Sequence, residues 1–151
     1  MASFKKKKTK NIIIASTFIF LIISFVVILF NSNNTEYVKK PNVDNWYNDI
    51  SSGKQVVTVI GLTTCQHCQA YKPVIKSLAN NEEFELYFFE SDLLSDGQAN
   101  KLINSFDLKD YDGYVPYTFI FKDNEYISGK VGYSNKNDII DFLKKNNVIK
   151  N

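Results

Sequence analysis

An uncharged run of nineteen residues, 12–30, constrains this 151-residue chain more than any other feature. It reads IIIASTFIFLIISFVVILF, and at about 1.5 Å per residue such a helix is roughly 28 Å long, close to the ~30 Å hydrocarbon core of a bilayer. The run is longer than the roughly 7–15 apolar residues of a cleaved signal peptide, and no A-x-A-like cleavage site follows it. A lipoprotein would need a cysteine at the end of the run, and none is there. The run therefore predicts an uncleaved transmembrane signal anchor.

The distribution of charge predicts how this anchor is oriented. Five lysines lie between positions 5 and 10, whereas every Asp and Glu lies after residue 35. By the positive-inside rule, residues 1–11 form a cytoplasmic basic segment and residues 31–151 lie outside the cell membrane. Residues 31–41 are polar and predict a tether, which leaves 42–150 for one folded domain. Residues 31–151 contain 13 Lys and 16 acidic residues, so nothing in their charge predicts a nucleic-acid partner.

Helical and strand periodicities alternate after residue 41. The predicted elements are, in order, a helix at 43–50, a strand at 55–62, a helix at 65–79, a strand at 84–90, a helix at 96–106, a β-hairpin at 117–131 that turns at 123–124, and a last helix. Thr63 or Thr64 is the expected N-cap of the second helix, and Ser134 or Asn135 that of the last. Two parallel crossovers followed by an antiparallel pair predict one central mixed sheet with helices on both faces.

The chain has two cysteines, Cys65 and Cys68, directly after a predicted strand and at the start of a predicted helix. A thiolate is a much better nucleophile than a thiol, and the free N–H groups and positive dipole end of a helix N-terminus stabilise the thiolate. Cys68 lies one turn further along, where it can close a disulfide with Cys65. The spacing predicts a redox couple in which Cys65 is the attacking thiol and Cys68 the resolving thiol of a mixed disulfide.

Three other interpretations of the pair fit the residues less well. A zinc site needs about four ligands, whereas the chain offers two Cys and one His, so we expect no metal and no cofactor. A purely structural disulfide would close a short loop and stabilise the domain little. Inert reduced thiols do not suit an exported protein, because exported compartments are oxidising.

His67 lies between the cysteines and is the only histidine of the chain. It could be an ordinary solvated side chain at a helix start. A cationic or hydrogen-bonding imidazole near Cys65 would instead favour the thiolate, and a more stable reduced pair makes the disulfide more oxidising. We therefore predict that His67 stabilises the Cys65 thiolate.

With these residues, 42–150 resembles the thioredoxin-fold family. Pro73, five residues after Cys68, matches the proline of the family's active-site helix, and Gly132 followed by a terminal helix matches the family's end. The resemblance implies an α/β, thioredoxin-like fold, a central mixed sheet flanked by helices, here preceded by one N-terminal transmembrane helix.

The same resemblance implies where a client polypeptide binds. Val115-Pro116 lies just before the predicted hairpin, where the family has a cis-proline that faces the disulfide. We therefore expect Pro116 to be in the cis form, and Val115, Pro116 and Gln66 to border the client-binding groove. An extended client segment would pair with the backbone beside Val115 as an added strand.

This chain differs from the pattern of the thioredoxins proper near the cysteines. Thioredoxins proper have Trp-Cys-Gly-Pro-Cys and a buried Asp on the preceding strand, whereas Thr64 precedes Cys65 here and Val59 occupies the position of that Asp. The proton acceptor used in thioredoxin-type reduction is therefore missing or lies elsewhere.

The remaining pattern resembles the Dsb-type disulfide oxidases, which have Cys-Pro-His-Cys and a Val before the cis-proline. His67 and Val115 match that pattern; Gln66 does not, and the chain lacks their large helical insertion. Small membrane-anchored thioredoxin-like proteins of Gram-positive bacteria, including bacteriocin accessory proteins, are similar in size and layout.

Together these features predict a membrane-anchored, extracytoplasmic thiol:disulfide oxidoreductase, an oxidase or isomerase rather than a reductase. Its partners would be an exported, cysteine-containing polypeptide and a redox partner in the membrane. Two alternatives stay open. One is a membrane-anchored reductase, for example in apocytochrome maturation; the other is a non-catalytic accessory or chaperone subunit of an export system.

Overall fold

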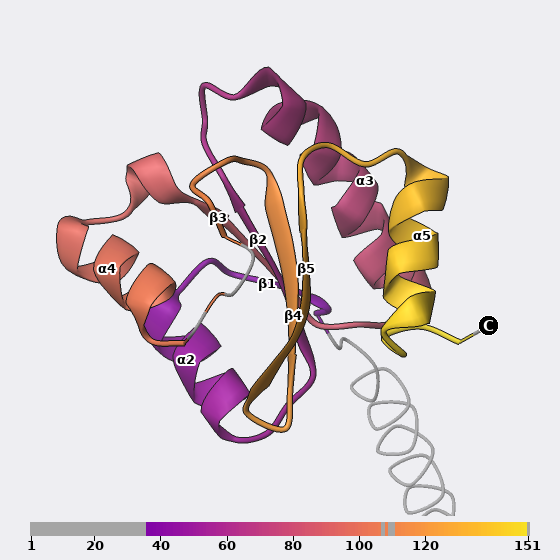
Figure 1. The fold of residues 1–151 in the computed structure, drawn as a ribbon, viewed down its shortest axis with the longest axis horizontal. Coiled ribbons are helices and arrows are strands. Elements are labelled where there is room, and N and C mark those ends of the chain that lie inside the picture. Colours follow the sequence, from indigo (N-terminus) through magenta and orange to yellow (C-terminus); the bar gives the residue numbers. More distant parts are fainter. Residues whose placement is uncertain (1–35, 107, 109–110, 151) are drawn as a thin grey trace, which may run out of the picture. The chain divides into compact units, whose positions relative to one another are not determined.

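A five-stranded mixed sheet forms the centre of the described chain, residues 36–106, 108 and 111–150 of a computed structural model (Figure 1). The strands lie in the order β1-β3-β2-β4-β5. Neighbours are parallel on the β1-β3-β2 side and antiparallel on the β2-β4-β5 side. The bounds are β1 (Val38–Lys39), β2 (Val56–Gly61), β3 (Leu86–Glu90), β4 (Tyr117–Lys122) and β5 (Glu125–Val131). The predicted mixed sheet is confirmed.

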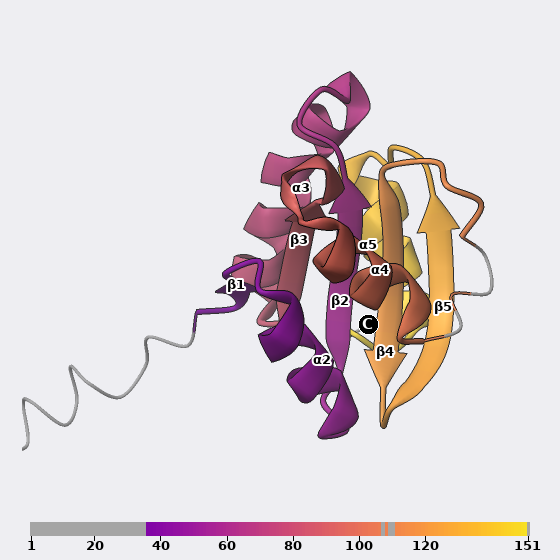
Figure 2. The same ribbon diagram turned by 90° about the vertical axis from the view of Figure 1, so that its left-hand side faces the viewer.

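Helices cover both faces of this sheet, as predicted. Figure 2 shows α2 and α4 in front of the strands and α3 and α5 behind them. Their bounds, together with a short 3₁₀ helix, are α2 (Val43–Ser51), α3 (Gln66–Glu82), η1 (Ser91–Leu93), α4 (Asp96–Asn104) and α5 (Lys136–Lys145). The helices α2, α3 and α4 and the strands β2 to β5 lie within a few residues of their predicted ranges, and α5 is the predicted last helix.

The central strand β2 is buried along its whole length because the sheet has helices on both sides. Val57 and Val59 pack with the core of α3 and α5, whereas Val56 and Ile60 pack with the core of α2 and α4. Alternate residues of the strand therefore belong to different cores. This double burial explains why the sequence of β2 is almost continuously apolar.

The tether expected over 31–41 contains a strand that the sequence did not predict. Val38 and Lys39 pair in parallel with Leu86 and Tyr87 of β3, and Lys39 Nζ lies 3.3 Å from Glu85 Oε1. Without β1, this edge of β3 would expose unpaired backbone groups. A strand of two residues has no detectable periodicity, so only long-range pairing reveals it.

The predicted anchor over 12–30 and the cytoplasmic segment 1–11 lie outside the described residues. Within the described part of the chain, no helix is both long enough and apolar enough to cross a membrane.

Candidate active site

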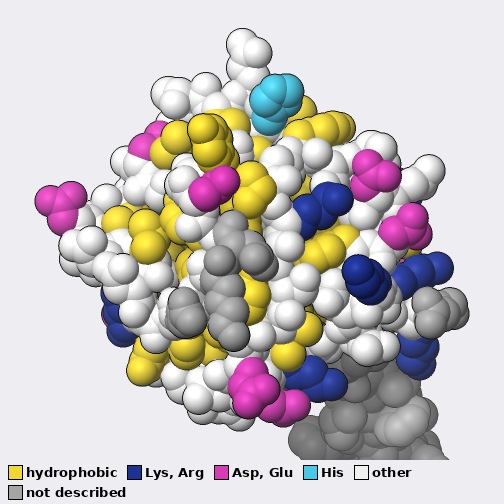
Figure 3. Space-filling model, viewed as in Figure 1, with side chains coloured by type: hydrophobic (Ala, Val, Ile, Leu, Met, Phe, Trp, Pro, Cys, Tyr) yellow, Lys and Arg dark blue, Asp and Glu magenta, His cyan; other side chains and the backbone are white. Residues whose placement is uncertain are grey.

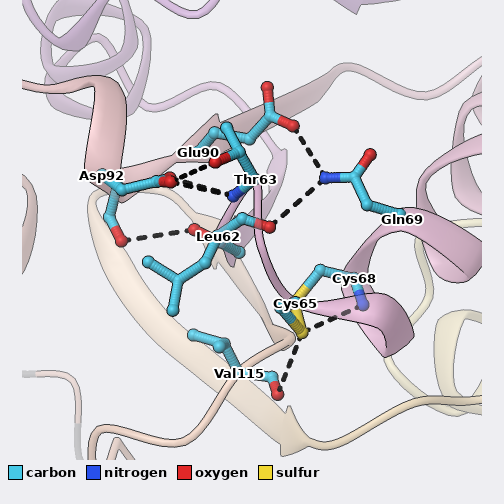
Figure 4. Close-up of a disulfide and its surroundings, with 10 residues drawn as sticks. Leu62, Thr63, Cys65, Cys68, Gln69, Glu90, Asp92 and Val115 are labelled. Carbon is cyan, nitrogen blue, oxygen red and sulfur yellow. Dashed lines mark hydrogen bonds between the residues drawn. A yellow bond between two sulfur atoms is a disulfide. The ribbon is translucent and has the colours of Figure 1, made fainter.

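A disulfide joins Cys65 and Cys68 at the N-terminus of α3, with their Cα atoms 5.2 Å apart (Figure 4). Cys65 is itself the N-cap of the helix, and its sulfur accepts a hydrogen bond from the Cys68 N–H at 3.1 Å. The prediction that Thr63 or Thr64 caps this helix is therefore wrong. The sulfur of Cys65 lies where helix N–H groups stabilise negative charge.

The two cysteines differ in their access to solvent. Cys65 is half-buried, whereas Cys68 is fully buried. A Cβ placed on Gly61, the last residue of β2, would lie 3.2 Å from the Cys68 Cβ and 3.3 Å from the Phe88 Cζ. Cys68 therefore packs directly on the end of β2, where a side chain larger than that of glycine would crowd Cys68 and Phe88. An incoming thiol or disulfide can reach only Cys65.

Val115 and Pro116 lie beside the disulfide, although they are about 50 residues away from it in the sequence. The Val115–Pro116 peptide bond is cis, which confirms the prediction. Figure 4 shows Val115 beside Cys65, whose Sγ lies 4.0 Å from the Val115 carbonyl oxygen. The structure thus brings this predicted pair and Cys65 together.

Gln66 and His67 are both exposed on the first turn of α3. The His67 ring lies 6.1 Å from the ring of Tyr133, which is 48% exposed. Figure 3 shows the single histidine beside hydrophobic side chains. This ring contact does not test the electrostatic role of His67, so its effect on the thiolate stays a prediction.

Asp92 holds the turn between β2 and α3, a role that the sequence did not indicate. Its carboxylate accepts from the Thr63 N–H at 3.0 and 3.1 Å and from the Thr63 hydroxyl. The Thr63 hydroxyl and N–H hold the pKa of Asp92 below its ordinary value. Because Thr63 is bound to η1 in this way, its side chain does not cap the helix.

A second polar group ties α3 to the sheet. Gln69 Nε2 donates to the Leu62 carbonyl at 3.3 Å and to Glu90 Oε1 at 3.0 Å, and Lys72 Nζ lies 2.8 Å from the same carboxylate oxygen. The Lys72 ammonium and the Gln69 amide hold the pKa of Glu90 below its ordinary value. These contacts fix the redox helix against β3 and the turn before Cys65.

The sheet face beneath the disulfide is almost entirely apolar. Val59 and Phe88 are buried there and adjacent in register, and the polar exception is a hydrogen bond of 3.0 Å between the hydroxyls of Tyr71 and Thr118. Burial raises the pKa of the Tyr71 phenol. Position 59 supplies no acid, as the sequence indicated. The described residues contain no cluster of three or more His, Cys, Asp or Glu side chains that could hold a metal ion.

This fold and site define a class: the chain has a thioredoxin-like fold with a Cys-x-x-Cys disulfide at the start of its active-site helix. Thioredoxin O2 from Arabidopsis thaliana, in its oxidised state, is similar with a TM-score of 0.58 and 18% identity over 76% of this chain and 97% of that one. A mutant thioredoxin from Halobacterium salinarum has a TM-score of 0.55 and 18% identity over 72% of this chain and 87% of that one.

Mitochondrial thioredoxin 3 from Saccharomyces cerevisiae, in its oxidised form, has a TM-score of 0.54 and 17% identity over 74% of this chain and 96% of that one. No protein-family model and no curated protein sequence matches the chain. The similarity to these solved structures is therefore one of fold.

Proposed function

We propose that this protein is a thiol:disulfide oxidoreductase that forms or exchanges disulfides in exported polypeptides. The observation that carries the proposal is the asymmetry of the disulfide. Cys65 is accessible and caps a helix, whereas Cys68 is buried behind it. Because of this asymmetry, a mixed disulfide can form only at Cys65, and Cys68 is the internal thiol that can resolve it.

The exchange reaction needs no component beyond the client. A client thiolate attacks the Cys65 sulfur, the Cys65–Cys68 bond breaks, and Cys68 leaves as a thiolate. A second client thiolate then attacks the client's own sulfur in the mixed disulfide and releases Cys65 as a thiolate that the helix N-terminus stabilises. The client loses two electrons and gains a disulfide; the protein gains the two electrons. A membrane redox partner would accept them to restore the disulfide.

The surface around Cys65 suits an extended polypeptide. The backbone at Val115 lies beside the sulfur, where a client strand can pair with it. Three large hydrophobic side chains near this end of the sheet are strongly exposed, namely Leu93, Tyr114 and Tyr133. Tyr114 directly precedes Val115, and Leu93 follows the Asp92 that holds the active-site turn. Apolar client side chains can therefore bind on either side of the cysteine.

The apolar floor of the site supports oxidation over reduction. Thioredoxin-type reduction uses an acid beneath the second cysteine, and Val59 occupies that position here. Stabilisation of the Cys65 thiolate favours the reduced protein, which makes its disulfide a stronger oxidant. We therefore expect a reduction potential above the roughly −270 mV of thioredoxin.

Two measurements test this function. Equilibration with glutathione gives the reduction potential, and a value at or below that of thioredoxin would favour the reductase alternative. Oxidation of a synthetic peptide with two cysteines gives the activity, which the Cys65→Ser/Cys68→Ser variant should lose completely. The chaperone alternative predicts a different pair of results. The wild type would not oxidise the peptide, and the double variant would prevent aggregation of an unfolded polypeptide as well as the wild type does.

A further inference from the structure

Two hydroxyl groups form an isolated polar pair inside the core between α3 and the sheet. Tyr71 is 0% exposed and Thr118 is 1% exposed, and their oxygens are 3.0 Å apart. Apolar side chains of α3, α5 and the sheet form the buried cluster on this face. Burying a hydroxyl costs free energy unless its hydrogen bonds are satisfied. Two buried hydroxyls near the disulfide therefore suggest a role beyond packing.

The positions of Tyr71 on α3 and of Thr118 on β4 place the pair near Cys68. Tyr71 follows Cys68 by three residues on α3, so the two side chains lie on the same buried face of the helix. Thr118 lies directly opposite Val59 in the β2-β4 pairing. Gly61, on which Cys68 packs, is two residues further along β2 and on the same face, a spacing of roughly 7 Å. Thr118 is therefore next to the position that lacks an acid, and Tyr71, which binds it, lies on the same buried face of α3 as Cys68.

Within the described part of the chain, the two hydroxyls share one hydrogen bond and leave one of their hydrogens without a protein acceptor. Two hydroxyls carry two hydrogens, and the bond between Tyr71 and Thr118 uses one of them. Among the described residues, neither oxygen has another hydrogen-bond partner. The second hydrogen is therefore free for a group that becomes an acceptor later in the reaction.

We propose that the Tyr71–Thr118 hydroxyl pair donates this second hydrogen to the Cys68 sulfur when the disulfide is open, directly or through one water, and so stabilises the Cys68 thiolate that resolves the mixed disulfide. This inference rests on the proposed function, because the open disulfide is its reacting state. The pair acts as a donor and not as a base. Burial keeps the Tyr71 phenol protonated by raising its pKa, and a thiolate is the acceptor that such a donor favours.

The reaction that reports on this role is oxidation of the reduced protein by glutathione disulfide. In the first step, the Cys65 thiolate attacks glutathione disulfide, a protein–glutathione disulfide forms, and one glutathione thiolate leaves. In the second step, Cys68 loses its proton to solvent and attacks Cys65, the Cys65–Cys68 bond forms, and the second glutathione thiolate leaves. The protein loses two electrons, and glutathione disulfide gains them.

The Tyr71→Phe/Thr118→Val double variant removes both hydroxyls without leaving either one unpaired, so we expect it to fold. At pH 7 the first step should keep its wild-type rate. The second step should slow about tenfold, because a hydrogen bond to a charged group is lost. Trapping with acid and mass spectrometry of the glutathione adduct separate the two steps. The Tyr71→Phe/Thr118→Ser variant, which regains one hydroxyl, should recover most of the second-step rate.

Thr58→Val is the matched control. Thr58 accepts a hydrogen bond of 2.8 Å from the Trp46 indole N–H in the opposite core, so the variant also loses a buried hydrogen bond to a threonine hydroxyl, but away from the disulfide. It should lose stability and keep both rates. An unchanged second step in the double variant, or an equal slowing in Thr58→Val, would overturn the role of the pair. Failure of the wild type to oxidise the two-cysteine peptide would instead reject the proposed function, since the glutathione reaction needs no client.

Discussion

At the scale of single residues, two cysteines three positions apart have opposite surroundings. Cys65 lies at a helix N-terminus beside the Val115 carbonyl, with access to solvent. Cys68 is packed on Gly61 and has no exposed surface. The proposed division into an attacking and a resolving thiol therefore rests on burial and position, since the residue types are identical.

His67→Ala tests the electrostatic contribution of the histidine. If the imidazole favours the Cys65 thiolate from the first turn of α3, its loss should raise the pKa of the Cys65 thiol and lower the reduction potential of the couple. Thiolate absorbance against pH gives the first quantity, and equilibration with glutathione gives the second. Gln66→Ala, at the neighbouring exposed position, serves as the control. No change in either quantity would mean that His67 has no part in the chemistry.

Glu90→Gln tests the ion pair and hydrogen bond that join Glu90 of β3 to Lys72 and Gln69 of α3. Lys72 and Gln69 lower the pKa of Glu90 in the folded protein, so ionised Glu90 stabilises the fold above its unfolded pKa. This contribution is lost as the pH falls through the lowered folded pKa. At pH 7 the variant should lose about 0.5–1 kcal/mol of unfolding free energy. Below the folded pKa the difference between wild type and variant should shrink.

Urea unfolding at pH 7 and at acidic pH measures this difference. Glu125→Gln is the matched control, because Glu125 is exposed at the start of β5 and has no ion pair among the residues that the structure describes. It should change stability little at either pH. A Glu90→Gln variant with the same deficit at both pH values would show that the carboxylate's charge does not contribute.

At the scale of elements, the site depends on how closely α3 approaches the end of β2. The absence of a side chain at Gly61 permits this approach, and the contacts of Glu90 and Asp92 with the turn and helix maintain it. Strand, turn and helix therefore act as one unit that presents Cys65 and covers Cys68.

Gly61→Ala should damage this unit. The added methyl would lie 3.2 Å from the Cys68 Cβ and 3.3 Å from the Phe88 ring, so overpacking should cost about 1–3 kcal/mol of unfolding free energy. Gly97→Ala is the control, because a Cβ at Gly97 meets nothing within 4 Å and lies in α4. It should leave stability equal or raise it by up to about 1 kcal/mol. Equal stabilities of the two variants would contradict the close packing of Cys68 on β2.

At the scale of the whole molecule, the proposed function requires the thioredoxin-like unit to lie on the outer side of the membrane. The five lysines before residue 11 and the uncharged run over 12–30 support that orientation. Because β1 begins at Val38, the connection between the run and the sheet is shorter than the eleven-residue tether that the sequence suggested.

Protease added outside intact protoplasts should digest residues 36–151 and leave a short, membrane-bound N-terminal fragment. A cytoplasmic protein in the same cells should stay intact, as the control for lysis. Protection of the thioredoxin-like unit until the cells are lysed would reject the orientation, and recovery of a released form that lacks residues 1–30 would reject the anchor.

The sequence by itself determined the order of the main helices and strands, the hairpin turn at Asp123–Asn124 and the pairing of Cys65 with Cys68 in a disulfide. These features depend on periodicity, turn chemistry and spacing over a few residues, which a sequence displays directly. The resemblance to the thioredoxin fold also placed Pro116 correctly, because its motif keeps a constant position before the hairpin.

Tertiary structure alone decided what surrounds the disulfide. Tyr71 and Thr118 are 47 residues apart, and they meet because α3 packs on the face of the sheet where β4 pairs with β2. β1 pairs with the outer edge of β3, and the Thr63 that the sequence offered as a helix cap binds Asp92 of η1 instead. Each of these contacts depends on long-range pairing, which brings together side chains whose separate sequence patterns carry no sign of each other.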